Sequence, residues 1–264
     1  MDVISSAQNP RIKQWAKLHI RKEREKAGLF LLEGPHLIEE ACRFEAPIQA
    51  ILLQDHIEEI PAWLDTYSAR SQTPLFQTTA QVMEKLSETK SPQGMIAVVE
   101  MNRQVPRNLP EDFLLLMVDR LQDPGNLGTL IRTADAAGFH GVVIGEGSVD
   151  LYNGKAIRST MGSLFHLPVW NADLAQFIAQ TRSSYPDVRV IGTSLEESKL
   201  YNDVSYAGPV MLVIGNEGSG ITENILAFTD ENVIIPIYGK AESLNAAVAG
   251  SVLMYEAVRQ RNDR

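Results

Sequence analysis

The chain has 264 residues, a net charge of −9 and an apolar content of 44%, ordinary values for one large or two small globular domains. No apolar run reaches the roughly eighteen residues of a membrane span, and the N-terminus lacks the apolar core of a secretory signal. A single cysteine, Cys42, excludes an intrachain disulfide. These features predict a cytoplasmic protein that does not enter a membrane.

The first hundred residues alternate helix and strand patterns. Asn9-Pro10 begins an amphipathic helix, and further helical patterns cover residues 36–44 and 79–87. Short apolar runs predict strands at residues 28–33, 48–53 and 94–99. The proline-containing segment 101–110 indicates a linker. We therefore expect a small α/β domain over residues 1–105.

The second half repeats strand and helix patterns from residue 113 onward, and a long helix over residues 243–259 closes the chain. Strands are predicted at residues 113–118, 141–145, 167–170, 188–192, 210–214 and 233–237. This alternation is typical of a mostly parallel sheet, here of six strands, with helices on both faces. We expect it to form a domain over residues 106–264.

The N-terminal segment is basic although the chain is acidic. Residues 1–30 hold seven Lys or Arg and three acids, a net charge of +4, which leaves −13 for the remainder. This asymmetry favours a local contact with a polyanion. A solvated helix of mixed charge is the alternative, and residues 21–26 (RKEREK) carry the mixed signs that would suit one.

Three strand-end loops contain polar residues and glycines that could form one shared site, because parallel strands present their carboxyl ends at one edge of a sheet. The first loop contains Asn126, Gly128 and Arg132. Asn126 by itself could be a helix N-cap, and Arg132 by itself could be a surface charge. Together, after a buried strand, they indicate a ligand site.

The second loop has the sequence Gly-Asn-Glu-Gly-Ser-Gly from residue 215 to residue 220. Its spacing differs from a dinucleotide-binding fingerprint, and Glu217 would repel a pyrophosphate. A tight loop with an exposed acid is the alternative. In the third loop Ser243 could cap the last helix, which would leave Asn245 in the first turn against its propensity.

Arg158 begins a basic and hydroxyl-bearing segment that is equally consistent with a polyanion contact and with capping and packing. The five histidines show no metal-ligand spacing, so no metal site is predicted. Neither a nucleophile elbow nor a phosphate-binding P-loop is present.

The three loops, taken in order, resemble the motifs of the SpoU (TrmH-type) branch of the SPOUT RNA methyltransferases. The matching residues are Asn126, Gly128 and Arg132, then Gly215, Glu217, Gly218 and Gly220, then Ile235, Pro236, Ser243, Leu244 and Asn245. Residues 1–100 resemble the substrate-binding domain that often precedes this domain, through Asn9-Pro10, Arg21-Lys22, Phe30–Glu33 with Gly34, and Ser91–Gly94.

The resemblance implies a fold and an activity. The expected fold is an α/β SPOUT domain with a C-terminal deep trefoil knot, preceded by a small α/β (L7Ae-like) RNA-binding domain. The expected protein is a homodimer that binds S-adenosylmethionine and methylates a ribose 2′-hydroxyl of RNA, ribosomal RNA in preference to transfer RNA.

The resemblance also implies roles for individual residues. The expected catalytic residues are Arg132, Asn126, Glu217, Ser243 and Asn245. The methyl donor is expected at Thr193, Leu195, Gly215, Asn216, Gly218, Ile235 and Leu244. RNA is expected at Arg11, Lys13, Lys17, Arg21, Lys22, Arg24 and Arg158. Because an arginine normally stays protonated, Arg132 suits stabilisation of a developing alkoxide better than proton abstraction.

Two rival interpretations remain. A non-catalytic RNA-binding or ribosome-assembly factor could use the same fold, although the intact polar residues of the three loops argue against it. A nucleotide-binding enzyme of the ordinary doubly wound type is disfavoured because the dinucleotide fingerprint is absent.

Overall fold

The computed structural model describes residues 1–57, 59–106, 108–194 and 198–262. The chain divides into two compact units, one of residues 1–102 and 152–165 and the other of residues 103–151 and 166–264. Residues 152–165 therefore pack with the first unit, whereas the sequence analysis placed them in the second domain. Among the described helices, none has the length and apolar character that crossing a bilayer requires.

The first unit contains a mixed five-stranded sheet in the order β1-β4-β3-β5-β2. Its strands are β1 (Asp2–Ile4), β2 (Leu29–Glu33), β3 (Ile48–Gln54), β4 (Leu75–Thr78) and β5 (Met95–Glu100). β5 is antiparallel to both β2 and β3, whereas β4 is parallel to β3 and β1. β1 and β4 were not predicted, because runs of three and four residues show too little alternation to be recognised as strands.

Helices and short turns surround this sheet. The α-helices are α1 (Pro10–Ala16), α2 (Arg21–Ala27), α3 (Pro35–Arg43), α4 (Ala62–Ser71), α5 (Ala80–Leu86) and α7 (Gly154–Thr160). The short 3₁₀ helices are η1 (Lys17–His19) and η2 (Ser163–Phe165). As predicted, α1 begins after Asn9, whose side chain accepts a hydrogen bond from the Arg11 N–H. Ile12 and Trp15 of α1 belong to the core of this unit.

The second unit contains a seven-stranded sheet in the order β10-β12-β9-β11-β6-β7-β8, and every recorded pairing is parallel. Its strands are β6 (Leu114–Val118), β7 (Gly141–Gly145), β8 (Val169–Ala172), β9 (Arg189–Thr193), β10 (Lys199–Leu200), β11 (Val210–Ile214) and β12 (Glu231–Ile234). The parallel sheet was predicted correctly. The predicted count of six omitted β10, an edge strand of two residues.

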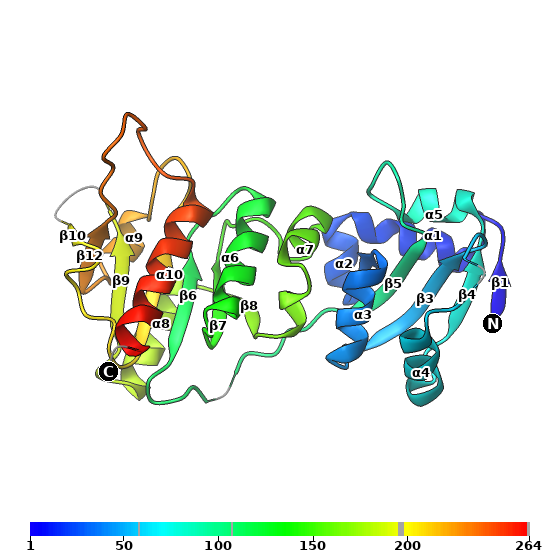
Figure 1. Cartoon of the computed structure of the whole chain (residues 1–264), viewed down its shortest axis with the longest axis horizontal. Coiled ribbons are helices and arrows are strands. Elements are labelled where there is room, and N and C mark those ends of the chain that lie inside the picture. Colours follow the sequence, from blue (N-terminus) through cyan, green and yellow to red (C-terminus); the bar gives the residue numbers. More distant parts are fainter. Residues whose placement is uncertain (58, 107, 195–197, 263–264) are drawn as a thin grey trace. The chain divides into compact units, whose positions relative to one another are not determined.

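Helices cover both faces of the second sheet. They are α6 (Pro124–Ala136), α8 (Leu174–Ser184), α9 (Glu223–Leu226) and α10 (Ala246–Asn262). Leu115 and Met117 of β6 pack in one cluster with Ile178 of α8, so alternate residues of the strand face this layer. On the other face α6 and α10 lie side by side (Figure 1). The trefoil knot stays a prediction of the family resemblance.

The contact between α6 and α10 depends on Gly250, because a Cβ there would lie 2.5 Å from Leu130 Cδ2. The side of α10 that packs inward is lined by Ala247, Gly250, Leu253, Met254 and Ala257. A second apolar stripe of the same helix is left at the surface: Val248 is 50% exposed and Tyr255 is 52% exposed.

Candidate functional site

The polar site is built where β6 and β11, neighbouring parallel strands, end and their loops meet. Glu217, in the loop after β11, accepts hydrogen bonds from the backbone N–H groups of Gln122 (3.1 Å) and Asp123 (3.0 Å), in the loop after β6. Its carboxylate also accepts from Asn126 Nδ2 at 2.9 Å. Three donors, two from the loop after β6 and one from Asn126 just beyond it, therefore hold the carboxylate of Glu217 in the loop after β11.

This arrangement determines the ionisation of Glu217. Partial burial would raise the pKa of its carboxyl, but the hydrogen bonds from Asn126, Asp123 and Gln122 outweigh burial and lower the pKa below the ordinary value. Glu217 is thus a carboxylate at neutral pH. Glu217 was predicted to be catalytic from the family resemblance, with an exposed acid of a tight loop as the alternative. In the structure Glu217 is exposed, and its carboxylate accepts hydrogen bonds from protein donors.

The third loop joins the same network through Asn245. Asn245 Nδ2 donates to Asn126 Oδ1 at 2.9 Å, and Asn126 in turn donates to Glu217. Asn245 Oδ1 accepts from the N–H groups of Ala247 (2.9 Å) and Val248 (3.2 Å) at the start of α10. A chain of three side chains therefore connects the three predicted motifs.

Both helix caps differ from the prediction. Asp123 caps α6, because its side chain accepts from the Asn126 N–H at 2.9 Å, and Pro124 follows at the first helical position. Asn245 has the capping position of α10, whereas Ser243 is exposed and makes no recorded hydrogen bond within the described chain. Asn126 thus lies in the first turn of α6 and not at its cap, whereas Asn245 has a capping position that suits an asparagine.

The glycine-rich loop after β11 is a tight turn closed on itself. Asn216 N donates to Gly220 O at 2.9 Å, and Gly220 N donates back to Asn216 O at 3.0 Å. A Cβ at Gly215 would lie 2.2 Å from both Gly220 C and Ile221 N, so only glycine fits there. Asn216 Oδ1 accepts from the N–H groups of Gly218 and Ser219. These contacts give Gly215, Asn216 and Gly218 a structural role in the loop.

The residues expected at the methyl donor lie at two neighbouring strands. Thr193 ends β9 and is paired with Val233 of β12, two residues before Ile235. Leu195 lies outside the described residues. Ile235 is half-buried, and Leu244 is 39% exposed. Within the described chain, no backbone N–H from Ile235 to Leu244 has a protein acceptor, so this segment offers free backbone donors to a ligand.

Arg132 projects from the exposed side of α6, six residues after Asn126. The structure records no hydrogen bond or ion pair for its guanidinium within the described residues. Its neighbour Thr133 contacts Ser251 of α10 at 3.2 Å between hydroxyl oxygens. Arg132 is therefore a cation available to a substrate on the helix that also holds Asn126.

Four residues of this site were missed by sequence reasoning: Asp119, Arg120, Gln122 and Asp123. Asp119 is 5% exposed and accepts from the Thr222 N–H at 2.7 Å, which holds the end of the glycine-rich loop. The Asp-Pro pair at residues 123–124 was a usable signal for a helix start, since proline favours the first helical position. The partners of Asp119 and Gln122 are far along the chain, and no local pattern indicates them.

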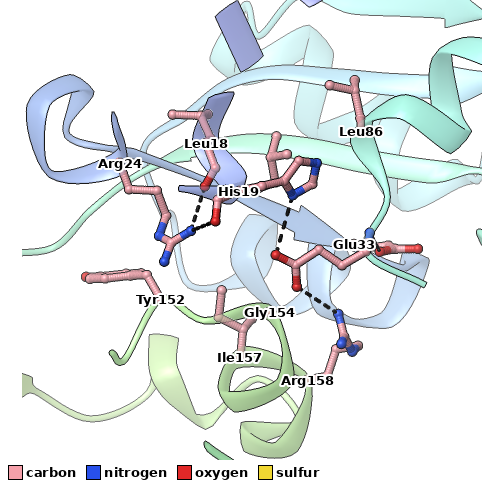
Figure 2. Close-up of a pocket in the computed structure, with 11 residues that line it drawn as sticks. Leu18, His19, Arg24, Glu33, Leu86, Tyr152, Gly154, Ile157 and Arg158 are labelled. Carbon is pink, nitrogen blue, oxygen red and sulfur yellow. Dashed lines mark hydrogen bonds and ion pairs between the residues drawn. The ribbon is translucent and has the colours of Figure 1, made fainter. Parts of the chain in front are cut away.

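In the first unit, the predicted RNA contacts divide by exposure. Arg11, Lys13, Lys17, Arg21 and Lys22 are exposed. Arg24 is 5% exposed, and its Nη1 donates to the carbonyl oxygens of Leu18 (2.7 Å) and His19 (2.9 Å), as Figure 2 shows. This prediction is corrected: Arg24 braces the α1–α2 connection and does not face solvent.

Arg158 lies beside the same small pocket of the first unit (Figure 2). It is half-buried, and its Nη1 lies 3.9 Å from Glu88 Oε2. This contact favours the packing interpretation of the segment. Within the described residues, no group of His, Cys, Asp and Glu side chains is placed to hold a metal ion.

Comparison with known proteins connects this geometry to a family. The sequence model of the SpoU rRNA Methylase family matches residues 113–255, and that of the MRM3-like substrate binding domain matches residues 9–97. The chain is 40% identical to the 23S rRNA (guanosine(2553)-2'-O)-methyltransferase RlmP of Bacillus subtilis, over 97% of this chain and 98% of the relative.

Solved structures agree over both units. The SpoU methyltransferase AviRb of Streptomyces viridochromogenes, in complex with AdoMet, superposes with a TM-score of 0.86 at 32% identity and covers 97% of this chain and 99% of its own. An AdoMet-bound rRNA methyltransferase of Sinorhizobium meliloti superposes with a TM-score of 0.87 at 29% identity, covering 98% and 97%. The chain therefore belongs to the SpoU rRNA methylase family.

Proposed function

We propose that this chain transfers a methyl group from S-adenosylmethionine to a ribose 2′-hydroxyl of 23S ribosomal RNA in the cytoplasm. The observation that supports this most is the hydrogen-bonded chain Glu217–Asn126–Asn245, which joins three strand-end loops. Arg132, on the same helix as Asn126, has no protein partner within the described residues. RlmP of Bacillus subtilis and a relative from Streptomyces viridochromogenes are named as 23S rRNA 2'-O-methyltransferases, which favours ribosomal over transfer RNA as the substrate.

The segment after β12 fits the methyl donor. Its backbone N–H groups have no acceptor within the described part of the chain and would bind polar atoms of the cofactor. Half-buried Ile235 and exposed Leu244 would offer apolar surface to an adenine ring. Thr193 lies at the adjacent strand end. The bound cofactor would supply an already activated sulfonium methyl group.

The remaining task is to activate a ribose hydroxyl, a weak acid at neutral pH. We assign to Arg132 the stabilisation of the developing alkoxide or of the adjacent phosphate, because its guanidinium stays protonated. Asn126, Glu217 and Asn245 are positioning residues: their hydrogen bonds to one another and to backbone groups hold α6 against the other loops. Ser243 is exposed beside them and remains a candidate ribose contact.

Purified protein incubated with labelled S-adenosylmethionine and a 23S rRNA transcript tests the function. We expect one ribose position to gain a 2′-O-methyl group, detectable as a block to alkaline cleavage at that nucleotide. Calorimetric titration with S-adenosylmethionine, run beside the transfer assay, distinguishes a methyltransferase from a non-catalytic RNA-binding factor. Absence of methyl transfer to any RNA, even where the cofactor binds, would support the non-catalytic factor.

We assign RNA recognition to the first unit, where the substrate-binding model matches. The Lys13→Ala/Lys17→Ala variant removes two exposed cations of the basic N-terminal segment (residues 1–30), called the basic arm below. We expect the magnitude of the slope of log affinity against log salt concentration to fall by about 1.5. Each phosphate contact releases a counterion when RNA binds, and the variant loses two such contacts. Filter binding at several salt concentrations measures it. Arg43→Ala/Arg70→Ala, which removes two exposed cations of the same unit outside the arm, should keep the slope, and an equal drop there would refute the assignment.

We also propose that the chain is a homodimer, with the exposed apolar stripe of α10 at the interface. Val248 and Tyr255 of α10 are 50% and 52% exposed, and Leu244, just before the helix, is 39% exposed. Contiguous exposed apolar surface marks protein–protein contact sites. Sedimentation equilibrium should show a dimer for the natural chain and a weakened dimer for Val248→Glu. Ala179→Glu places the same charge at an exposed position of α8 and should leave the dimer intact. A monomeric natural chain would end this proposal.

A further inference from the structure

Arg120, directly after β6 and Asp119, has a backbone conformation that arginine rarely adopts. Its φ is 55°, in the left-handed region that glycine enters freely and that a residue with a Cβ enters only with strain. The side chain is exposed. Such strain in a loop persists where the surrounding structure enforces it, and it occurs often at functional sites.

Three loops enforce the conformation of Arg120. Its carbonyl oxygen accepts from Asn216 Nδ2, in the loop after β11, and from Gln122 Nε2, both at 2.9 Å. Gln122 Nε2 also donates to Gly147 O at 2.8 Å, in the loop after β7. The backbone of Arg120 is thus fixed at the centre of the strand-end loops that form the candidate site.

The side chain of Arg120 rests on the loop after β7. An ideal Cβ at Gly147 would lie 3.3 Å from Arg120 Cγ and 3.6 Å from Nε, so glycine leaves room for the arginine stem. The stem is therefore placed by packing against the loop. A placed stem reduces the rotamer freedom that the guanidinium would otherwise lose on binding a ligand.

The guanidinium of Arg120 has no recorded hydrogen bond or ion pair within the described residues. The nearby acids are engaged elsewhere: Asp119 accepts from the Thr222 N–H, and Glu217 accepts from Gln122, Asp123 and Asn126. Glu146, the exposed acid before Gly147, makes no ion pair with it. A strained, positioned cation at this edge therefore has no partner among the side chains that the structure describes.

We propose that Arg120 binds a backbone phosphate of the RNA next to the nucleotide that is methylated. This inference rests on the proposed function. A planar guanidinium can donate two parallel hydrogen bonds to phosphate oxygens, and contacts of this kind set the register of the RNA without reading its bases. Arg120 would thus place the target ribose relative to the three loops, while Arg132 acts on the hydroxyl.

The test is Arg120→Gly, which removes the cation and also relieves the strain. We expect the Tm to rise by about 2–4 °C, because glycine suits the left-handed backbone. We expect KM for a 23S rRNA transcript to rise about five- to twentyfold and the salt slope of RNA binding to fall by about one. The Kd for S-adenosylmethionine, measured by calorimetry, should stay within about twofold. Arg120→Lys should recover part of the RNA affinity without the gain in Tm.

Gln72→Gly is the matched control, since Gln72 has φ 57 at an exposed helix end in the first unit. It should raise the Tm and leave the RNA parameters unchanged. An unchanged KM and salt slope for Arg120→Gly would overturn the proposal, and a lower Tm would contradict the backbone strain from which it is argued. If the natural chain itself transfers no methyl group to RNA, the proposed function fails. RNA binding by the same variants then still decides whether Arg120 contacts phosphate.

Discussion

Replacing Arg132 by alanine is expected to slow methyl transfer by about 10²- to 10⁴-fold, the range seen when one charge-stabilising or proton-handling group is removed. The Kd for S-adenosylmethionine should stay within about twofold. The reason is the placement of Arg132: it is exposed on α6, unpaired within the described residues, and absent from the hydrogen-bonded chain that joins the loops. Single-turnover transfer to a 23S rRNA transcript and calorimetric titration of the cofactor measure the two effects.

Two further variants define what the guanidinium does. Arg132→Lys keeps the charge but loses the planar fork, so partial activity would indicate alkoxide or phosphate stabilisation by charge. Thr129→Ala changes another exposed position of α6 and should retain full activity. Full activity in Arg132→Ala would remove Arg132 from the mechanism, whereas loss of cofactor affinity would assign it to binding.

Replacing Glu217 by glutamine is expected to weaken S-adenosylmethionine binding by about tenfold and to destabilise the second unit by about 1–2 kcal/mol. The glutamine amide would direct donor hydrogens at backbone N–H groups and at Asn126 Nδ2, which the carboxylate now satisfies. The loops after β6 and β11 would then separate. The segment after β12, which we assign to the methyl donor, would no longer be held against them. Calorimetry and thermal unfolding measure both losses.

The pH dependence of the Glu217 effect has a defined sign. Because the folded protein lowers the pKa of this carboxyl, its stabilisation is present above the ordinary glutamate pKa of about 4.3 and is lost as the pH falls through the lower folded pKa. The stability difference between the natural chain and Glu217→Gln should therefore be constant near neutrality and shrink in acid. Glu111→Gln, which changes an exposed acid of the same unit, should lose neither S-adenosylmethionine affinity nor stability. A difference that grows in acid would contradict this account.

The positions of the three loops could be predicted, but their connections could not. Each loop follows a buried strand in a parallel sheet, so a shared edge followed from alternation alone. The partners within that edge are far apart in the chain: Glu217 binds Asn126, and Asn126 binds Asn245. Helix propensity suggested that Asn245 is unfavourably placed in a first helical turn, whereas Asn245 caps α10 and donates a hydrogen bond to Asn126 of α6.

The apolar stripe of α10 shows the same limit in packing. Leu244, Val248, Val252 and Tyr255 form the apolar face that the sequence suggested, yet the structure buries the adjacent face, which is lined largely by alanine and glycine. Hydrophobic periodicity identifies the apolar faces of a helix, but it does not tell which of two such faces is buried. Close approach to α6 at Gly250 selects the face of small side chains.

Hydrophobic period, glycine and proline placement, and charge along this chain were sufficient to determine the α/β class, the parallel sheet, the basic arm and the three ordered motifs, because each depends on residues close in sequence. Tertiary structure alone decided that Arg24 is buried, that Glu217, Asn126 and Asn245 hold one another, and that Arg120 and Arg132 remain unpaired within the described chain. These outcomes depend on which distant backbone groups meet once strands β9, β11, β6 and β7 take their order in the sheet. That order is set by non-local packing, which a local pattern does not encode.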